Sequence, residues 1–383
     1  MSSDRIKINR IARRKMKREM KKREKRKAYD TVDILKNPYM YAKAYARTRR
    51  GVSWKPSIQR WELSLYNNIV HSIDKVLYMT DEKLSFHYFY LNERGKLRYI
   101  QSVNVDERVV QHVLCDECIY PAINESIIYD NAASIKHRGT EFTICRLKRH
   151  LHEYYRRQQS NNGCVLLVDF SDFFGSLSHE ILGKLIDDLF ETPEIRFELK
   201  RIINSFEGEI GIGLGSQVSQ LFAVVYVNKI DHYIKEVLRV HQYGRYNDDS
   251  YFILHDENEC QYILDILLPR YTEIGLKVNL NKTKIIRLDN PKGFKFLKKT
   301  FILTESGKVL IEQNPQNLKR FRHKMRAFKE FYENGELDLE YIRRNIKDWC
   351  AINRPYMHNR DIVSSINYAN KLFGMKLIDP YKK

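Results

Sequence analysis

The sequence of 383 residues predicts an α+β fold in which long helices alternate with short hairpin strands. The apolar run Cys164–Phe170 is typical of a buried strand. Residues 243–254 predict a strand–turn–strand, with Asn247, Asp248 and Asp249 in the tight turn. The stretch Gln217–Leu238 predicts one long helix. These three observations exclude an all-helical or an all-strand fold.

The composition is that of a globular protein. Hydrophobic residues make up 43% and charged residues 30% of the chain, whereas disordered chains contain far fewer apolar residues. The longest apolar run, Leu221–Val227, is much shorter than the roughly 20 residues of a membrane-spanning helix. No apolar segment of a signal peptide follows the basic N-terminus, so we expect a cytoplasmic protein with reduced cysteines. Cys115 and Cys118 are predicted as buried core residues of a helix rather than metal ligands.

Positive charge is concentrated at one end. The formal net charge is +19, which indicates a polyanionic partner, with nucleic acid favoured over a membrane surface. Residues 1–50 hold 19 Lys and Arg against five acids, so the rest of the chain is nearly balanced. We interpret Arg5–Lys27 as a basic helical arm that binds phosphates. The alternative is a solvated arm that only aids solubility.

The remaining elements follow from apolar spacing and turn residues. Helices are predicted at 56–77, 106–118, 141–157, 178–189, 259–275, 316–349 and 362–373. Strands are predicted at 87–92, 96–102, 277–280, 285–288, 295–303 and 308–312. Residues 208–215 are rich in glycine. No internal repeat is visible.

The helix after Pro315 is amphipathic. One apolar stripe recurs at three and four residues: Leu318, Phe321, Met325, Phe328 and Tyr332. Basic residues, Lys319, Arg322 and Arg326 among them, cover the other faces. The pattern fits either an ordinary surface helix or a helix that faces nucleic acid.

Three acidic residues are candidates for metal binding and catalysis. Asp169 ends a buried strand, where an unpartnered carboxylate is costly. Asp248 and Asp249 bring like charges together in a turn, which a divalent cation would relieve. Carboxylates without nearby His or Cys favour Mg²⁺ over Zn²⁺. Two Mg²⁺ ions held by such carboxylates are the apparatus of phosphoryl transfer. Asp pairs in turns are common by themselves, so a catalytic role for Asp248 and Asp249 depends on the motifs that surround them.

That context resembles the successive palm motifs of a reverse transcriptase. The motifs are Val168–Phe174 (VDFSDFF), Gly215 with Ser219 and Gln220, Tyr246–Asp249 (YNDD), Gly275–Asn279 with Lys282, and Phe294–Leu297 (FKFL). Upstream, Lys96–Ile100, Glu107–Gln111 and Asn131–Thr140 resemble the fingers motifs of bacterial reverse transcriptases. The resemblance covers roughly residues 85–350, and its order and spacing make it specific as a set.

The resemblance implies a right-hand polymerase fold with fingers, an antiparallel-sheet palm and a helical thumb, plus a basic N-terminal helical arm. The implied division is 1–50 for the arm, 51–160 for the fingers, 161–313 for the palm with part of the fingers, and 314–383 for the thumb and C-terminal region. The implied activity is RNA-directed DNA synthesis from dNTPs. Catalysis is assigned to Asp169, Asp248, Asp249 and Lys282. The ligands of two Mg²⁺ ions, which Mn²⁺ could replace, are Asp169, Phe170, Asp248 and Asp249.

The resemblance also assigns binding residues. Phe174 would collide with a 2′-hydroxyl and select dNTPs; the alternative is a core Phe, as expected for Phe173. Lys96 and Arg98 would hold the triphosphate, or be ordinary exposed cations, and Gln220 would contact the nucleotide or template. The nucleic-acid-binding residues are Arg13, Arg14, Lys17, Lys319, Arg322 and Arg326.

Differences from the usual reverse transcriptase motifs indicate which subgroup of the family the sequence resembles. Ser219-Gln220 stands where intron-encoded enzymes have Ser-Pro, and a retron-type Val-Thr-Gly signature is absent from the sequence. Within the group II intron and retron-like lineage, we therefore expect a phage-defence (abortive-infection type) enzyme that copies a dedicated non-coding RNA. The alternatives are a diversity-generating retroelement enzyme, a template-independent or protein-primed polymerase, and a non-catalytic RNA-binding module.

Overall fold

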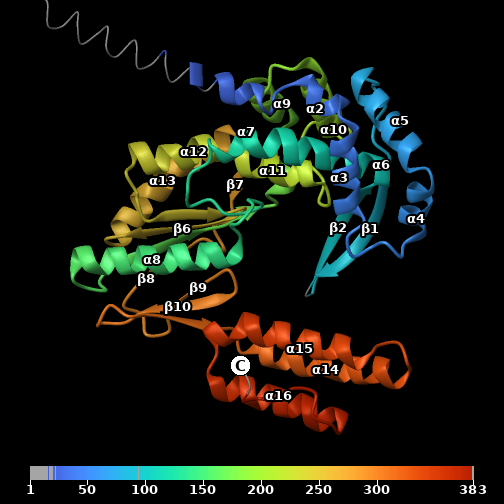
Figure 1. Ribbon diagram of the computed structural model, residues 1–383. Coiled ribbons are helices and arrows are strands. Elements are labelled where there is room, and N and C mark those ends of the chain that lie inside the picture. The colour runs from blue at the N-terminus through green and yellow to red at the C-terminus, as the bar shows by residue number, and fades with distance from the viewer. Residues whose placement is uncertain (1–15, 17–19, 22, 94, 382–383) are drawn as a thin grey trace, which may run out of the picture. The chain divides into compact units, whose positions relative to one another are not determined.

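The computed structural model describes residues 16, 20–21, 23–93 and 95–381 (Figure 1). The chain divides into two compact units. Unit 1 contains residues 1–143, 167–252 and 261–284, and unit 2 contains residues 144–166, 253–260 and 285–383. Two of the predicted binding residues, Arg13 and Arg14, lie outside the described residues, as does Lys17.

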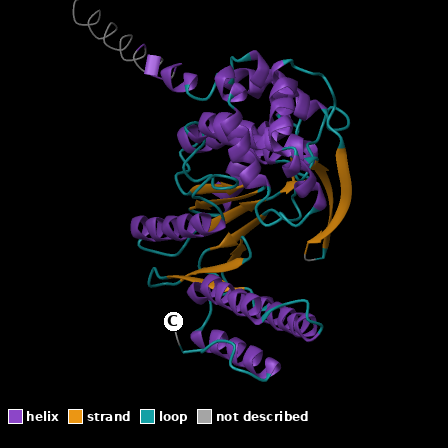
Figure 2. Cartoon of the chain, turned by 45° about the vertical axis from the view of Figure 1, so that its right-hand side comes forward, coloured by secondary structure: helices purple, strands orange, loops and turns teal. Residues whose placement is uncertain are grey.

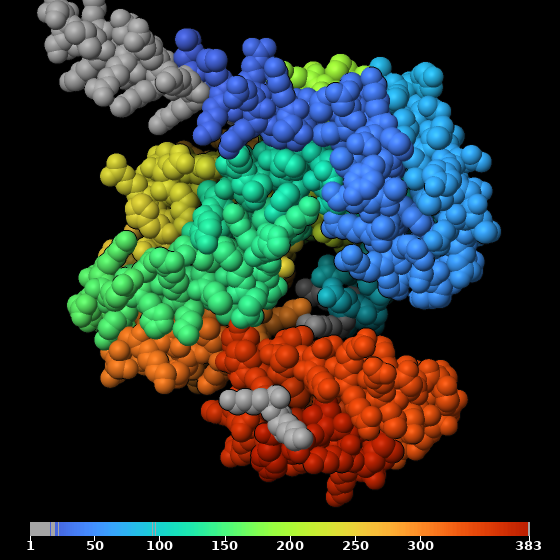
Figure 3. Space-filling model, in the orientation of Figure 1, coloured from blue at the N-terminus to red at the C-terminus, as the bar shows by residue number. Residues whose placement is uncertain are grey.

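Most of unit 1 is helical. Its helices are α2 (Val32–Lys36), α3 (Pro38–Thr48), α4 (Pro56–Leu63), α5 (Leu65–Leu77), α6 (Val105–Val113), α7 (Tyr120–Asn124), α9 (His179–Leu189), α10 (Pro193–Asn204), α11 (Gln217–Tyr226) and α12 (Asn228–His232). Leu35 and Tyr41 are fully buried, so α2 and α3 belong to the core of this unit. In Figure 3 these two helices, in dark blue, form a continuous surface with the lighter blue α4 and α5.

A long hairpin joins these helices. Strands β1 (Phe86–Glu93) and β2 (Lys96–Val103) pair antiparallel from Phe86↔Val103 to Glu93↔Lys96. The hairpin predicted from the sequence is therefore present. Figure 2 shows it as a curved pair of strands that extends beyond the helices of unit 1.

A four-stranded sheet carries the predicted turn. Its strands are ordered β5 (Tyr243–Tyr246), β6 (Asp249–Leu254), β3 (Cys164–Val168) and β8 (Lys284–Arg287). Strands β5 and β6 pair antiparallel through Tyr246↔Asp249, which leaves Asn247 and Asp248 as a two-residue loop. Short strands β4 (Phe170–Ser171) and β7 (Lys277–Val278) pair separately. The long helices α8 (Thr140–Gln158) and α13 (Glu257–Glu273) each contribute residues to both units.

Unit 2 ends in a helical bundle. A three-stranded sheet, β9 (Phe294–Phe296), β10 (Lys299–Leu303) and β11 (Val309–Gln313), precedes α14 (Gln316–Glu333), α15 (Leu339–Asn353) and α16 (Asn359–Phe373). The three helices lie side by side in Figures 1 and 2. Phe321, Met325 and Phe328 of the predicted stripe are buried in their common core, whereas Lys319, Arg322 and Arg326 are exposed. The amphipathic pattern is confirmed.

Four predicted elements are interrupted. The helix expected over 56–77 is divided at Ser64 between α4 and α5, and the helix expected over 316–349 is divided between α14 and α15. The single helix expected over Gln217–Leu238 breaks at Val227 between α11 and α12. The guanidinium of Arg245 donates to the carbonyl of Val224 at 2.7 Å, and an uninterrupted helix would use that carbonyl within its own backbone. The strand expected over 295–303 breaks at Leu297 and Lys298, which have left-handed φ values of 45° and 67°.

The cysteines are free thiols. Cys115, Cys118, Cys164, Cys260 and Cys350 are buried, and Cys145 is exposed on α8. The predicted burial of Cys115 and Cys118 is confirmed, and burial raises the pKa of both thiols. Among the described residues, no helix combines the length and apolar character needed to cross a membrane.

Candidate active site

Asp169 follows directly after β3, where the buried strand reaches the protein surface. Its backbone carbonyl accepts a hydrogen bond from the amide of Asn279 at 2.8 Å. The turn that begins at Asn279 brings the ammonium of Lys282 to 2.9 Å from Oδ1 of Asp169. Two distant motifs predicted from the sequence therefore meet at this carboxylate.

Asp248 and Asp249 sit where β5 turns into β6. Asn247 has a left-handed φ of 53°, which Asn tolerates better than most residues and which a two-residue hairpin loop requires. Asp248 occupies the second loop position and Asp249 begins β6. The tight turn predicted from the sequence is confirmed. Because β6 pairs with β3 in the sheet, this turn lies beside the end of the strand that precedes Asp169.

The electrostatics of the three acids are coupled through Lys282. Burial raises the pKa of Asp248, and the negative charge of Asp169 raises it further, against the opposing charge of Lys282. The hydrogen bond to Asp169 raises the pKa of Lys282, and the charges of Asp248 and Asp249 add to the effect. Two partly buried carboxylates therefore repel each other, and one lysine partly neutralises them.

This arrangement fits a divalent cation in its donor chemistry. Carboxylate oxygens are hard ligands, and the repulsion between Asp169 and Asp248 is what a cation would relieve. In the part of the chain that the structure describes, however, no three His, Cys, Asp or Glu side chains converge as a metal-binding group. The ligand set predicted from the sequence stays a prediction. Phe170 is buried and could contribute only its backbone carbonyl.

An open pocket of about 570 Å³ lies next to the turn. Asp248, Phe174 and Arg98 line it together with Gly211 and Gly213. Phe174 is half-buried and meets the buried Phe173 edge to face, with ring centroids 5.6 Å apart. The predicted core position of Phe173 is confirmed. Asp248, Phe174 and Arg98, which the resemblance assigned to the metal, the sugar and the triphosphate respectively, thus line one pocket.

The glycine-rich segment, residues 208–215, lies close to strand β2 of the β1–β2 hairpin. A Cβ on Gly213 would lie 1.9 Å from Oε1 of Gln101, so no larger residue fits without displacing that side chain. The amide of Gln101 donates to the carbonyl of Leu214 at 3.0 Å. The absence of a side chain at Gly213 therefore lets β2 approach the segment closely.

Other predicted binding residues have partners of their own. Arg98 forms an ion pair with Glu93 across the hairpin at 2.8 Å. The backbone of Lys96 pairs with Glu93 in the same hairpin. Gln220 is exposed on α11, where its amide oxygen lies 3.5 Å from the hydroxyl of Ser134. It is not among the side chains that line the pocket with Phe174 and Asp248.

A buried ion pair supports the turn, and the sequence reading missed it. Arg245 and Asp231 are completely buried and lie 2.7 Å apart. Arg245 also donates to the carbonyl of Asn247 at 3.1 Å, and Tyr243 donates to Asp231 at 2.6 Å. An arginine inside an apolar strand is the signal that could have revealed the pair, because such a charge needs a partner.

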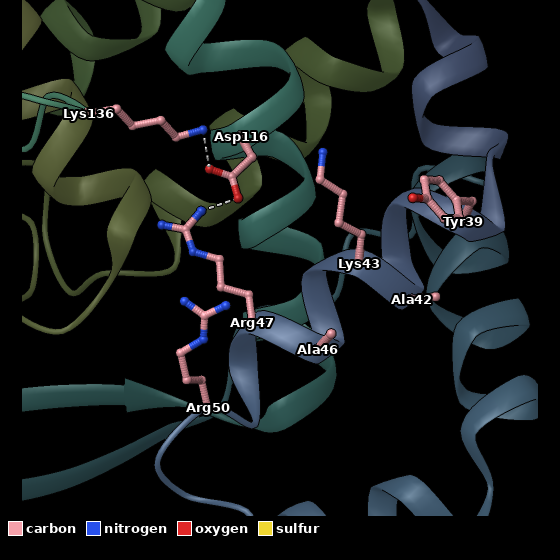
Figure 4. A pocket seen from close by; sticks show the side chains of 8 residues that line it. All are labelled: Tyr39, Ala42, Lys43, Ala46, Arg47, Arg50, Asp116 and Lys136. Carbon is pink, nitrogen blue, oxygen red and sulfur yellow. Dashed lines mark hydrogen bonds and ion pairs between the residues drawn. The ribbon is translucent and has the colours of Figure 1, made fainter.

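A second hollow of similar size is basic. It is lined by Tyr39, Ala42, Lys43, Ala46, Arg47, Arg50, Asp116 and Lys136. In Figure 4, Arg47 and Lys136 approach the carboxylate of Asp116 from two sides. Lys43 pairs with Glu117 at 2.7 Å. The sequence reading also missed this hollow, because its cations come from segments almost 90 residues apart.

The comparison with protein families identifies the chain. The family described as reverse transcriptase (RNA-dependent DNA polymerase) matches residues 83–301, more than half of the chain. The chain belongs to the reverse transcriptase family. The mixed helices and antiparallel strands are consistent with the right-hand polymerase fold of this family. The matched region holds Asp169, Asp248 and Asp249.

Solved telomerase structures are similar to this chain at low identity. Telomerase from Candida albicans, solved with a TWJ fragment of telomeric RNA, is 12% identical with a TM-score of 0.48 over 82% of this chain. Apo telomerase from Candida tropicalis is 10% identical with a TM-score of 0.48 over 77%. The chain spans 65% and 63% of the length of these telomerase chains. No curated protein matches it.

Proposed function

We propose that this protein is an RNA-directed DNA polymerase that adds dNTPs to a 3′-hydroxyl on an RNA template. The observation that carries the proposal is the electrostatic coupling of Asp169, Asp248 and Lys282, with Asp248 lining the pocket, in a chain of the reverse transcriptase family. Both the fold and the acidic chemistry suit phosphoryl transfer.

Two Mg²⁺ ions would be held by Asp169, Asp248 and Asp249 with the backbone carbonyl of Phe170, and Mn²⁺ could replace them. When bound, such ions supply Lewis-acid activation of the attacking hydroxyl and neutralise charge on the phosphates. Asp169 and Asp248 contribute the negative charge that selects a cation at this point. The Arg245–Asp231 pair holds the carbonyl of Asn247 and thereby the position of Asp248.

Lys282 is proposed as the proton donor to the pyrophosphate leaving group. Its raised pKa keeps the ammonium protonated at neutral pH, so it holds a transferable proton. Before nucleotide binds, the ammonium is fixed at 2.9 Å from Oδ1 of Asp169. A triphosphate entering the site would compete with Asp169 for that ammonium.

The nucleotide would be selected by the walls of the pocket. Phe174 is proposed to exclude a 2′-hydroxyl, and Arg98 with Lys96 to bind the triphosphate after Arg98 leaves Glu93. Gln220 is proposed to contact the nucleotide or the template. The exposed Lys319, Arg322 and Arg326 of α14 are proposed to bind the duplex backbone, and Arg13, Arg14 and Lys17 to bind the RNA.

The proposed function also divides the chain into the subdomains of a right-hand polymerase. We propose that residues 1–50 form the arm, 51–160 the fingers, 161–313 the palm with part of the fingers, and 314–383 the thumb and C-terminal region. The biological role proposed is cytoplasmic anti-phage defence with a dedicated non-coding RNA as template, in the bacterial group II intron and retron-like lineage. The Ser219-Gln220 pair and the basic arm support this choice. A diversity-generating role is the alternative.

Primer extension tests the proposed function. Purified protein with Mg²⁺, dNTPs and a primed RNA should extend the primer. Asp248→Ala should lower the rate by at least about a hundredfold, because it removes a metal ligand. Asp265→Ala, an exposed acid on α13, is the matched control and should extend normally. Extension that survives Asp248→Ala would refute the assigned site.

The same reaction separates the alternatives. Products complementary to the RNA, and lost without it, support templated synthesis. Homopolymer made without RNA indicates a template-independent polymerase, and product bound covalently to the protein indicates protein priming. RNA binding without any synthesis would indicate a binding module. Phage plating on cells with and without the active enzyme tests the defence role.

A further inference from the structure

One face of the β1–β2 hairpin carries a row of aromatic rings. Alternate residues of a strand share a face, and the register places Tyr88 opposite Gln101 and Tyr90 opposite Tyr99. Phe86, Tyr88, Tyr90 and Tyr99 therefore lie on the same side of the hairpin. We call these four residues the aromatic stripe.

The rings of the aromatic stripe contact one another in sequence. Tyr88 and Tyr99 are stacked, with centroids 5.5 Å apart and planes 12° apart. Tyr90 lies 5.2 Å from Tyr99 at a more tilted angle. At the other end, Phe86 stacks on Phe206 with centroids 5.0 Å apart. The contacts fix the orientation of the rings from Phe206 outward.

The outer rings of the stripe are open to solvent. Tyr88, Tyr90 and Tyr99 are 56%, 67% and 46% exposed. Three neighbouring tyrosines with exposed faces form an apolar patch that contributes little to the core of unit 1. A patch of this kind typically marks a surface that binds something.

The stripe is continuous with the candidate active site. Tyr99 and its neighbour Gln101 line the same pocket as Phe174 and Asp248. The inner end of the stripe is anchored there, since Phe206 also lines that pocket. A strand that leaves the pocket along the hairpin would pass over Tyr99 and then Tyr88 and Tyr90.

We propose that the aromatic stripe is a stacking platform for unpaired bases of the single-stranded RNA template that enters the site. The proposal rests on the proposed polymerase function, whose template must reach the pocket unpaired. Every base offers a flat π-face, so aromatic rings bind single strands with little regard to sequence. The continuity of the stripe with the pocket favours the template over a protein partner.

The test measures binding of a primed RNA with a single-stranded template overhang that carries 2-aminopurine. The base should be quenched on binding because it stacks on the rings. Replacing Tyr88 and Tyr90 together by Ala should weaken binding about tenfold or more and restore the fluorescence. Replacing both by Phe keeps the rings and should retain binding and quenching. Tyr66→Ala and Tyr262→Ala, at exposed tyrosines of α5 and α13, are the matched controls.

A second comparison removes the bases instead of the rings. An overhang of abasic nucleotides should bind the natural protein more weakly than a normal overhang, and the Tyr88→Ala/Tyr90→Ala protein should not distinguish the two. Equal binding of both overhangs by the natural protein would overturn the proposal. So would a change in oligomeric state of the double variant with unaltered RNA binding, because that result indicates a protein partner.

Failure of this inference and failure of the proposed function give different results. Primer extension by the natural protein with no effect of the ring substitutions on binding or quenching would reject the stripe and retain the polymerase. Quenching that depends on the rings, in a protein that never extends a primer, would retain the stripe as an RNA-binding surface and reject the polymerase.

Discussion

At the scale of single residues, Asp248 is held in an unfavourable place for a carboxylate. Burial and the neighbouring Asp169 both raise its pKa, so the folded protein disfavours the ionised form. Active sites commonly keep such repulsion because a bound cation or substrate relieves it. The stability of the metal-free protein should therefore improve when this charge is removed.

Asp248→Asn should raise the melting temperature of the metal-free protein by a few degrees at neutral pH. A folded-state pKa above the unfolded value means that the natural protein loses stability as pH rises from the ordinary Asp range through the raised pKa. The advantage of the variant should therefore vanish in acid, near pH 4. Thermal unfolding with and without Mg²⁺ measures the effect, and Mg²⁺ should stabilise the natural protein more. An Asn variant that is less stable at neutral pH would contradict the argument.

A second prediction at the residue scale concerns Phe174 and the choice between dNTPs and rNTPs. Phe174→Ala should lower the preference for dNTPs over rNTPs by at least about tenfold, because the ring would no longer exclude the 2′-hydroxyl. The ratio of kcat/KM for the two nucleotides measures the effect. Phe174→Tyr, which keeps the ring, is the control. An unchanged ratio in the Ala variant would assign Phe174 to packing against Phe173.

The sequence indicated some of these residues and missed others. The acids and Phe174 are recognisable because they occur at fixed spacings in local motifs. The pairing of Lys282 with Asp169 joins residues more than 100 positions apart, and the sequence, which assigned both residues to the site, did not predict the ion pair. The Arg245–Asp231 pair belongs to no motif. Its partners come together only when α12 packs beside β5, so sequence spacing could not predict it.

At the scale of elements, the turn between β5 and β6 depends on that buried pair. Arg245 ties three elements together: it bonds Asp231 of α12, the carbonyl of Val224 in α11 and the carbonyl of Asn247 in the turn. The same contact explains why the predicted helix 217–238 is interrupted. Local propensity favours a continuous helix, and a tertiary hydrogen bond overrides it.

Arg245→Met should destabilise the protein by about 3–5 kcal/mol, because Asp231 would remain buried without its partner. Arg245→Met combined with Asp231→Leu should cost less than the single change, since no charge is left buried. Denaturant titration measures both free energies of unfolding. Arg245→Lys should rescue only in part, because an ammonium cannot donate to Asp231, Val224 and Asn247 in the same planar geometry. A double variant less stable than the single one would contradict this account.

The boundaries of elements were predicted less well than their existence. The hairpin, the turn between β5 and β6 and the amphipathic helix after Pro315 are present as expected, because alternation and spacing encode them locally. The strand expected over 295–303 is divided by a turn at Leu297 and Lys298. Neither residue favours a left-handed backbone, so composition offered no signal for the break.

At the scale of the whole molecule, part of the basic N-terminal segment forms ion pairs with the folded chain. The last part of the basic segment is tied to unit 1: Arg26 pairs with Asp30 and Glu191, and Lys25 with Glu125. Asp30 in turn accepts the amides of Glu191 and Thr192 just before α10. The cations before residue 23 are therefore the part of the arm to test for RNA binding.

Deleting residues 1–22 should weaken RNA binding and flatten its dependence on salt, because each lost phosphate contact removes a released counterion. The deletion ends before Lys25 and Arg26, so the ion pairs of unit 1 are retained. Binding constants measured across a series of salt concentrations give the slope. Substituting Gln for the exposed cations Arg60, Lys184 and Lys229 is a control for lost charge elsewhere. An unchanged slope in the deletion would leave the arm with a role in solubility.

The distribution of cysteines makes the molecule suitable for labelling without mutagenesis. Five of the six thiols are buried, and buried thiols react slowly because the thiolate is disfavoured. A maleimide dye should therefore attach at Cys145 on α8, a helix that contributes to both units. A second dye on the end of a bound nucleic acid would then report, by energy transfer, whether its distance from α8 changes when nucleotide is added.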